Sequence, residues 1–405
     1  MQTNCPMSSP DPRILFASPH CLLDTTNGAA LATQELLIQL AERGFPCEVV
    51  TASICDPKRE VLMDEVLSHY SSAKITKSKM IKDVPCIEVN DGVLPHKILL
   101  TRSSRRPALR STEEEALLSL VERRIGEFQP NLLLTYGGLQ AERRIHRLAR
   151  QHKIPVVFYL HNSIYKRTET FTDVDLILVP SKFLSDFYKE RLRIQSRVLF
   201  PIFKSNDYIV QHRNPRFITF INPTPDKGLT LFARLVAEAF RKLPQAEFLV
   251  LEGRWTQADV ARAGLRLDRI PNVKVLPHQK DMKTIYAETL LLLYPSFWVE
   301  AFGRTIVEAQ MNGIPVLASG WGGIPEALNG GGFLFDIPER CTKNYMAIPT
   351  PEEVQPWIDQ LRVLLENQKV YEEAQRRAIQ AAQAFCPEKI VQEAIDLFKE
   401  LGVRA

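Results

Sequence analysis

The sequence predicts an α/β fold made of two doubly wound, parallel-sheet domains in tandem. Short apolar segments that are typical of buried strands alternate with helical segments along the chain, in two successive series. At 405 residues the chain is longer than one hydrophobic core usually serves, because domains hold about 100 to 200 residues each. Two domains are therefore expected, with a ligand cleft between them at the carboxyl ends of the strands.

The first series begins with an apolar strand at 13–20, a loop that contains Asn27 and Gly28, and a helix at 29–43. A strand, a glycine-containing loop, a helix and a second strand form the repeating unit of a parallel sheet. The further strands of this series are expected at 45–51, 98–101, 131–135, 155–160 and 176–179.

The second series follows a junction near 200–206 and shows no internal repeat of the first. Its strands are expected at 217–221, 247–252, 273–276, 290–294 and 315–318, again alternating with helices. Apolar residues at helical spacing in the last segment predict a terminal helix. The expected domains are therefore 1–203 and 204–386, followed by a helical segment at 387–405.

Composition narrows the class of protein. Apolar content of 45%, charged content of 24% and a net charge of +4 are ordinary for a soluble globular protein, and basic residues are not interleaved with aromatic residues as in nucleic-acid modules. No apolar run approaches the roughly 20 residues that span a bilayer, and the start lacks a signal-peptide pattern. Seven scattered cysteines argue against a disulfide framework or a structural zinc site, so a cytoplasmic location is expected.

One stretch, residues 290–326, carries most of the functional information. It reads as a strand, a short loop, a helix, a second strand and a glycine-led turn, and Glu300 and Glu308 bracket the first loop-to-helix junction. Free N–H groups at about Gly303, Arg304 and Thr305 would favour an anion such as a diphosphate. Because carboxylates repel phosphates, the glutamates should face neutral hydroxyls, and a nucleotide sugar offers such hydroxyls on both sides of its diphosphate.

These residues also carry a resemblance. The run Glu-Ala-Phe-Gly-Arg-Thr-Ile-Val-Glu-Ala at 300–309, followed by Asn-Gly-Ile-Pro-Val-Leu-Ala-Ser and Gly-Gly-Ile-Pro-Glu, resembles the donor-site signature of the family-4 retaining glycosyltransferases (glycosyl transferases group 1). The resemblance implies the GT-B fold, in which two Rossmann-like domains face each other across a cleft and a C-terminal helix crosses back to the first domain. The first domain would then hold the acceptor and the second the donor.

The resemblance implies roles for the signature residues. Glu308 would accept hydrogen bonds from the ribose hydroxyls, and Glu300 with the backbone of Phe302 and Gly303 would hold the donor sugar. Arg304 and Thr305 would assist a lysine in stabilising the charge that grows on the leaving diphosphate.

That lysine is expected at Lys227, in the segment Phe-Ile-Asn-Pro-Thr-Pro-Asp-Lys-Gly at 220–228. Relatives usually carry Gly-Arg before this lysine, and their Arg and Lys both bind the diphosphate. Here Asn222 stands at the arginine position and offers only neutral hydrogen bonds, which are roughly half as strong as charge-assisted ones. Arg304 is the candidate for the missing charge.

Two positions of the first domain are also candidates. His161 directly follows an apolar strand, where relatives place a histidine near the donor sugar. Gly28 lies where relatives have a glycine-rich loop whose backbone approaches the donor phosphate, although this chain has Asn-Gly instead of Gly-Gly. Asparagine tolerates left-handed backbone better than most residues, so the loop can survive the change.

We therefore expect a retaining hexosyltransferase whose donor is a nucleotide-diphosphate sugar, most often a UDP- or GDP-sugar, and which uses no metal and no other cofactor. Its one Asp-x-Asp, at Asp173 and Asp175, precedes a strand at the end away from the cleft. The acceptor stays open among small-molecule, glycan and lipid-linked hydroxyls, and peripheral membrane contact stays open too. The alternatives are an epimerase or glycoside phosphorylase of the same fold, or a noncatalytic nucleotide-sugar-binding subunit.

Overall fold

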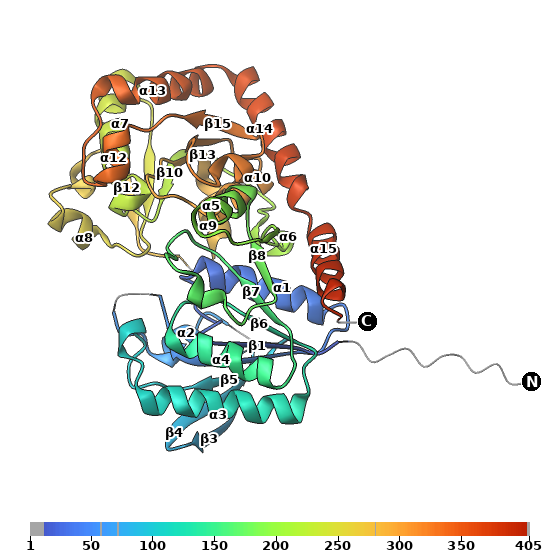
Figure 1. Ribbon diagram of the computed structural model, residues 1–405. Coiled ribbons are helices and arrows are strands. Elements are labelled where there is room, and N and C mark those ends of the chain that lie inside the picture. Colours follow the sequence, from blue (N-terminus) through green and yellow to red (C-terminus); the bar gives the residue numbers. More distant parts are fainter. Residues whose placement is uncertain (1–11, 57–58, 71–72, 280, 403–405) are drawn as a thin grey trace, which may run out of the picture. The chain divides into compact units, whose positions relative to one another are not determined.

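The computed structural model describes residues 12–56, 59–70, 73–279 and 281–402 (Figure 1). The chain divides into two compact units. The first unit runs to Pro180, resumes at Ser185–Ile202 and ends with the segment from Pro387. The second unit comprises Ser181–Leu184 and Phe203–Cys386. Sequence analysis placed the junction one residue later and did not assign Ser181–Leu184 to the second unit.

Hydrogen bonds to residues far along the chain explain why residues 181–184 belong to the second unit. The Ser181 hydroxyl donates to the carbonyl oxygen of Ala301 at 2.6 Å. The backbone N–H groups of Lys182 and Phe183 donate to the two carboxylate oxygens of Glu326 at 2.7 and 2.6 Å. A sequence pattern for the strand and helix around residue 181 does not contain these long-range partners.

Nine strands of the described chain form the sheet of the first unit, in the order β3-β4-β5-β2-β1-β6-β7-β8-β9. The strands from β5 to β9 in that order are parallel, and sequence analysis predicted all of them except β9. Strands β3 and β4 add an antiparallel extension that it did not predict. Their bounds are β1 Ile14–His20, β2 Cys47–Ile54, β3 Lys74–Ile81, β4 Val84–Asn90, β5 Pro95–Leu99, β6 Leu132–Thr135, β7 Val156–Tyr159, β8 Leu176–Val179 and β9 Arg197–Val198.

Helices cover both faces of this sheet, and the C-terminal helix α15 packs against α1 within the first unit (Figure 1). This confirms the expected return of the terminal helix to the first domain. The helices associated with this unit are α1 Gly28–Ala41, α2 Met63–Leu67, α3 Ser111–Phe128, α4 Gln140–Gln151, α5 Lys182–Leu192, which begins in the short segment of the second unit, and α15 Pro387–Glu400, with 3₁₀ turns η1 Arg106–Ala108 and η2 Thr168–Phe171.

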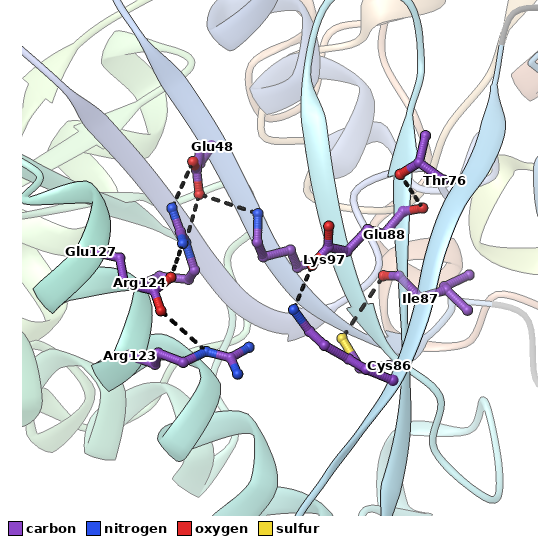
Figure 2. Close-up of polar contacts among 10 residues, drawn as sticks. Glu48, Thr76, Cys86, Ile87, Glu88, Lys97, Arg123, Arg124 and Glu127 are labelled. Atoms are coloured by element: carbon purple, nitrogen blue, oxygen red, sulfur yellow. Dashed lines mark hydrogen bonds and ion pairs between the residues drawn. The ribbon is translucent and has the colours of Figure 1, made fainter.

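Ion pairs fix α3 against the amino-terminal end of β2 (Figure 2). The guanidinium of Arg124 donates twice to the carboxylate of Glu48, at 2.9 Å each, and the ammonium of Lys97 on β5 lies 3.6 Å from the same carboxylate. Lys79 and Glu88 pair across β3 and β4 in the same region. Because the network lies where β2 begins, it is not at the carboxyl ends of the parallel strands.

Six parallel strands of the described chain form the sheet of the second unit, in the order β12-β11-β10-β13-β14-β15. Sequence analysis predicted five of them and missed β15. Their bounds are β10 Phe217–Ile221, β11 Phe248–Leu251, β12 Val273–Leu276, β13 Thr289–Tyr294, β14 Val316–Ser319 and β15 Gly332–Phe335. Because β10 lies between β11 and β13 and runs parallel to both, the loops that follow these three strands emerge at one edge of the sheet.

The helices of the second unit bury a core that includes Trp357, Phe232 and Phe220. The indole of Trp357 stacks on Phe335, with ring centroids 4.4 Å apart. The helices are α6 Ser205–Tyr208, α7 Leu229–Lys242, α8 Gln257–Arg262, α9 Met282–Glu288, α10 Arg304–Met311, α11 Ile324–Leu328, α12 Glu339–Lys343, α13 Pro351–Glu366 and α14 Gln368–Ala382, with 3₁₀ turns η3 Pro225–Lys227, η4 Leu267–Arg269 and η5 Gln383–Phe385. Within the described ranges, no helix has both the length and the apolar character to cross a bilayer.

Candidate functional site

The loop that follows β10 places Lys227 at the carboxyl edge of the second sheet. Lys227 is the last residue of η3, and Gly228 follows it with φ of +87°, in the left-handed region. A Cβ atom on residue 228 would collide with the carbonyl oxygen of Pro295, in the loop after β13. Glycine at this position therefore permits both the turn and the close approach of the two loops.

Lys227 forms an ion pair with Glu300. Sequence analysis expected these two residues to contact the same ligand. The Ser296 hydroxyl donates to the same Glu300 oxygen at 2.8 Å, which orients the carboxylate. The lysine ammonium also lies 5.9 Å from the ring centroid of Tyr294. The side chain of Lys227 is 20% exposed and that of Glu300 is 10% exposed, so the pair is partly shielded from water but reachable by a ligand.

The loop that carries Glu300 is clamped on two sides. The carbonyl oxygen of Asp226 accepts hydrogen bonds from the N–H groups of Phe297 and Trp298, both at 2.9 Å. On the other side, the N–H of Gly323, in the turn after β14, donates to the carbonyl oxygen of Glu300 at 2.8 Å. The backbone of the loop that carries Glu300 is thus fixed by hydrogen bonds to two neighbouring loops.

Helix α10 begins directly after this loop. Its N-cap is Gly303, whose φ is +121°, and no side chain within the described ranges caps the first turn. Arg304 and Thr305 are the first two helical residues, so their N–H groups lie at the positive end of the helix dipole. The ring of Phe302 is buried against Phe203 and Phe385.

Glu308 lies one turn further along α10 and is 8% exposed. The Tyr286 hydroxyl donates to one carboxylate oxygen at 2.7 Å, and the Nε of Arg304 lies 3.7 Å from the other. Burial raises the pKa of the Glu308 carboxyl, while the charge of Arg304 and the hydrogen bond from Tyr286 act against the rise. The carboxylate is therefore held in one orientation behind the helix N-terminus.

The guanidinium of Arg304 is occupied by side chains of its own domain. Besides Glu308, it donates to the hydroxyl of Tyr208 at 3.0 Å and lies over the ring of Phe203, 4.6 Å from its centroid. To replace the charge missing at position 222, the guanidinium of Arg304 would therefore have to give up three contacts. Its backbone N–H remains a candidate donor to an anion.

Asn222 serves the backbone of a neighbouring loop. It has a left-handed conformation, with φ of +61°, and its side-chain oxygen accepts a hydrogen bond from the N–H of Arg254 at 2.9 Å. Arg254 follows β11 by three residues, and sequence analysis did not select it. Its position just after a strand beside β10 is a signal that would have found it, since the ends of neighbouring parallel strands share one edge.

In the first unit, the structure brings His161 next to α1. The imidazole Nε2 lies 3.3 Å from the hydroxyl of Thr33, and the ring packs against Tyr159, with centroids 3.9 Å apart. Gly28 is the first residue of α1, and a Cβ there would meet no atom within 4 Å. The side chain of Asn27 caps this helix by accepting from the N–H of Ala29 at 2.9 Å.

A buried polar cluster at the carboxyl ends of β1 and β6 was not predicted. The Glu142 carboxyl, at the start of α4, lies 3.4 Å from both the Nε2 of His20 and the hydroxyl of Ser18. Burial raises the pKa of Glu142 to about 8, and burial together with the charge of Arg106 lowers the pKa of His20 to about 3. The contact is therefore between a neutral carboxyl and a neutral imidazole near pH 7, although its geometry alone would suit an ion pair.

The described residues contain no group of three or more His, Cys, Asp or Glu side chains that could hold a metal ion. Asp173 and Asp175 each lie beside an arginine of α4: Arg147 is 3.9 Å from Asp173, and Arg150 is 2.5 Å from Asp175. Asp175 also accepts from the backbone N–H of Val156 at 2.8 Å, so it contributes to the start of β7.

Comparison with known proteins finds a family match within the second domain. Residues 215–367 match the family model described as glycosyl transferases group 1. A D-inositol 3-phosphate glycosyltransferase from Corynebacterium kroppenstedtii is 31% identical over 121 residues, which are 27% of this chain. The match also covers only 27% of that relative.

Solved structures extend the likeness to the whole chain. Anabaena HepE in complex with UDP-glucose is similar with a TM-score of 0.67 and 17% identity, covering 96% of this chain and 100% of that one. A glycosyltransferase from Rickettsia africae has a TM-score of 0.68 and 15% identity, covering 97% of this chain and 99% of that one. Sucrose-phosphate synthase from Thermosynechococcus elongatus has a TM-score of 0.67 and 14% identity, covering 98% and 100%. At these identities the likeness establishes the fold, which is GT-B.

Two glycines of the second domain give a matched test of the turn that places Lys227. Gly228 and Gly264 both have φ of +87°, but a Cβ on Gly264 would meet no atom within 4 Å. Gly264→Ala should cost only the left-handed backbone term, about 1 to 2 kcal/mol of unfolding free energy. Gly228→Ala should cost clearly more, because Pro295 must also move. Urea unfolding followed by circular dichroism measures both, and equal losses would show that the two loops do not constrain residue 228.

The buried carboxyl of Glu142 predicts a pH dependence of stability. Between about pH 6.5 and 8, folded Glu142 keeps a proton that the unfolded chain releases, so the unfolding free energy should fall as pH rises, by at most about 1.4 kcal/mol per pH unit. Below pH 6.5 the neutral His20 opposes this trend, because unfolding then lets the imidazole take up a proton.

Glu142→Gln should flatten the decline between pH 6.5 and 8, whereas Glu127→Gln, whose carboxylate is 55% exposed on α3, should leave it unchanged. Urea unfolding at several pH values provides the measurement. A Glu142→Gln protein with the wild-type slope would contradict the assignment of a neutral buried carboxyl.

Proposed function

Because residues 215–367 match the model of the glycosyl transferases group 1, in a chain with the GT-B fold, we propose that this protein is a retaining hexosyltransferase. It transfers a hexosyl unit from a nucleotide-diphosphate sugar to an acceptor hydroxyl. The observation that carries the proposal is the pairing of Lys227 with Glu300 at the N-terminus of α10, with the carboxylate of Glu308 behind it. The lysine and the N-terminus of α10 match the diphosphate of such a donor, and the two carboxylates match the neutral hydroxyls on either side of it.

Lys227 stabilises the negative charge that grows on the diphosphate as the glycosidic bond breaks. The N–H groups of Arg304 and Thr305 add the positive end of the α10 dipole. Such preorganised donors and charges usually supply the largest part of catalysis. The charge of the leaving group is met by fixed groups of the protein, so we propose a reaction that requires no metal.

Glu300 has two successive partners in this proposal. Before the donor binds, its carboxylate neutralises Lys227. When the diphosphate takes up the lysine, the same carboxylate becomes available to the hydroxyls of the donor sugar, while Ser296 keeps it oriented. The backbone of Phe302 and Gly303 borders the same position.

Glu308 accepts hydrogen bonds from the ribose. Tyr286 and Arg304 hold its carboxylate in place, so little conformational freedom is lost when the ribose hydroxyls arrive. The bound UDP-glucose in Anabaena HepE supports a UDP-sugar as the first donor to test, and a GDP-sugar is the second.

We propose that the first domain binds the acceptor, that His161 acts near the donor sugar, and that the backbone at Gly28 approaches the donor phosphate. Acceptor classes under this proposal are small-molecule, glycan and lipid-linked hydroxyls, in a cytoplasmic protein. A double displacement would require an ionised, accessible carboxylate in this domain. Glu142 contacts Ser18 and His20 of β1, but it is fully buried and burial raises its pKa to about 8. A front-face reaction assisted by the leaving phosphate is therefore the favoured route to retention.

A donor screen followed by product analysis tests the proposal. Thermal unfolding with UDP, GDP, ADP and their sugars identifies the donor, because a ligand at about 100 times its dissociation constant stabilises the protein by about 2.7 kcal/mol. Transfer should release one nucleotide diphosphate per glycoside formed, whereas an epimerase would release none and a phosphorylase would require phosphate.

The product anomer and the response to a chelator test the mechanism. Proton NMR at early times should show the anomeric configuration of the donor in the product, and EDTA should not change the rate. An inverted product, or a rate that EDTA abolishes and magnesium or manganese restores, would refute this part of the proposal.

Three substitutions separate the roles of the donor-site residues. Lys227→Ala should lower turnover more than donor affinity, because the charge it meets is largest in the transition state. Glu300→Gln should leave affinity for the bare nucleotide diphosphate intact while transfer falls, since its partner is the sugar. Glu308→Ala should weaken that affinity by about 1.5 to 3 kcal/mol, the cost of removing a charged hydrogen-bond acceptor.

Calorimetry with the nucleotide diphosphate and steady-state kinetics with the donor provide the measurements. Lys343→Ala, an exposed lysine of α12 in the same domain, is the matched control for Lys227→Ala and should behave as wild type. Equal losses of affinity and turnover in Lys227→Ala would limit this residue to binding. Unchanged affinity in Glu308→Ala would remove Glu308 from the nucleotide site.

A further inference from the structure

Arg254 lies within reach of the lysine loop in the donor domain. It follows β11, the strand beside β10, and its backbone N–H is fixed by the side chain of Asn222 at 2.9 Å. The left-handed conformation of Asn222 turns the asparagine toward this loop, and the side chain of Asn222 also fills the space that a Cβ on Gly253 would occupy. Asn222 therefore positions Arg254 instead of supplying a charge itself.

The guanidinium of Arg254 reaches across to the loop that ends in Lys227. Its Nη2 donates to the carboxylate of Asp226 at 2.8 Å and lies 3.5 Å from the hydroxyl of Thr224. Asp226 and Lys227 are consecutive, so the contact with Asp226 brings Arg254, from the loop after β11, close to Lys227 in the loop after β10. The side chain of Arg254 is 42% exposed, and a ligand can reach it.

The charges of both cations act on the same carboxylate. Burial by itself would raise the pKa of Asp226, but the charges of Arg254 and Lys227, with hydrogen bonds from Thr224 and Arg254, hold it below its ordinary value. Two cations beside this loop thus each have their own internal anion: Lys227 pairs with Glu300 and Arg254 pairs with Asp226. A diphosphate has two phosphate groups and can replace both anions at once.

We propose that Arg254 binds the donor diphosphate together with Lys227, and that Asp226 is the counterion that Arg254 releases when the donor arrives. This inference rests on the proposed function and specifies how the site meets the second phosphate. An arginine suits the role because its planar guanidinium can contact a phosphate through two parallel N–H bonds. Arg304, the alternative cation, would have to leave Glu308, Tyr208 and Phe203.

Calorimetry with nucleotides tests the proposal directly. The nucleotide is UDP, or whichever of UDP, GDP and ADP binds the wild type most tightly, together with its monophosphate. Arg254→Ala should weaken diphosphate binding about 10- to 100-fold, as expected for loss of a charged hydrogen bond, and should weaken monophosphate binding less. Arg254→Lys should recover part of the loss. Arg262→Ala, an exposed arginine of α8 that pairs with Asp259, is the matched control and should bind as wild type.

Asp226→Asn distinguishes binding from a structural ion pair. The carbonyl oxygen of Asp226 holds Phe297 and Trp298, and this backbone contact persists when the side chain becomes an amide. If Arg254 binds the diphosphate, freeing it from Asp226 should strengthen binding. If the pair only supports the loop, Asp226→Asn and Arg254→Ala should weaken binding alike, and that result would overturn the proposal.

Failure of this inference can be told apart from failure of the proposed function. Should Lys227→Ala weaken diphosphate binding while Arg254→Ala leaves it unchanged, the inference is wrong and the proposed function stands. If the wild type binds none of the three nucleoside diphosphates, both are refuted. Thermal unfolding of each variant without ligand checks that it folds, and Arg254→Lys provides the same comparison if the alanine variant does not.

Discussion

The candidate site of the second domain depends on the backbone carbonyl of Asp226. By accepting hydrogen bonds from Phe297 and Trp298, it joins the loop after β10 to the loop after β13. That junction brings Lys227 beside Glu300, and the close approach explains why residue 228 must be glycine. The side chain of the same aspartate holds Arg254 from the loop after β11. Asp226 therefore links the loops that follow three adjacent parallel strands.

Charge balance follows from this arrangement. Lys227, Arg254 and Arg304 each face a carboxylate of the same domain. An unpaired cation in a partly buried site would lower the stability of the fold, and pairing each cation with a carboxylate avoids this cost. A ligand with two phosphates can replace the internal anions only if it offers at least equal interactions, which favours a diphosphate over an anion with a single charge.

The polar side chains at the strand ends of the first domain differ from those of the second, because they are buried and neutral and do not form ion pairs. At its strand ends, Glu142 and His20 are both buried and neutral near pH 7, and Ser18 completes the contact. This cluster therefore offers no ionised carboxylate. His161, in contrast, is only partly buried and lies against α1 through Thr33. This difference is why we propose a role in the reaction for His161 and not for Glu142.

Sequence alone determined the two-domain α/β architecture, most of the parallel strands and the residues of the donor signature. It could do so because strand and helix periodicity is local, and because the signature from Glu300 to Glu308 is contiguous. Only the tertiary structure decided that β3 and β4 extend the first sheet, that Asn222 supports a neighbouring backbone, that the guanidinium of Arg304 is occupied, and that Arg254 reaches the lysine loop. These features depend on partners that are tens to more than a hundred residues away or on strand order, and a pattern read along one chain does not specify which strand ends become neighbours.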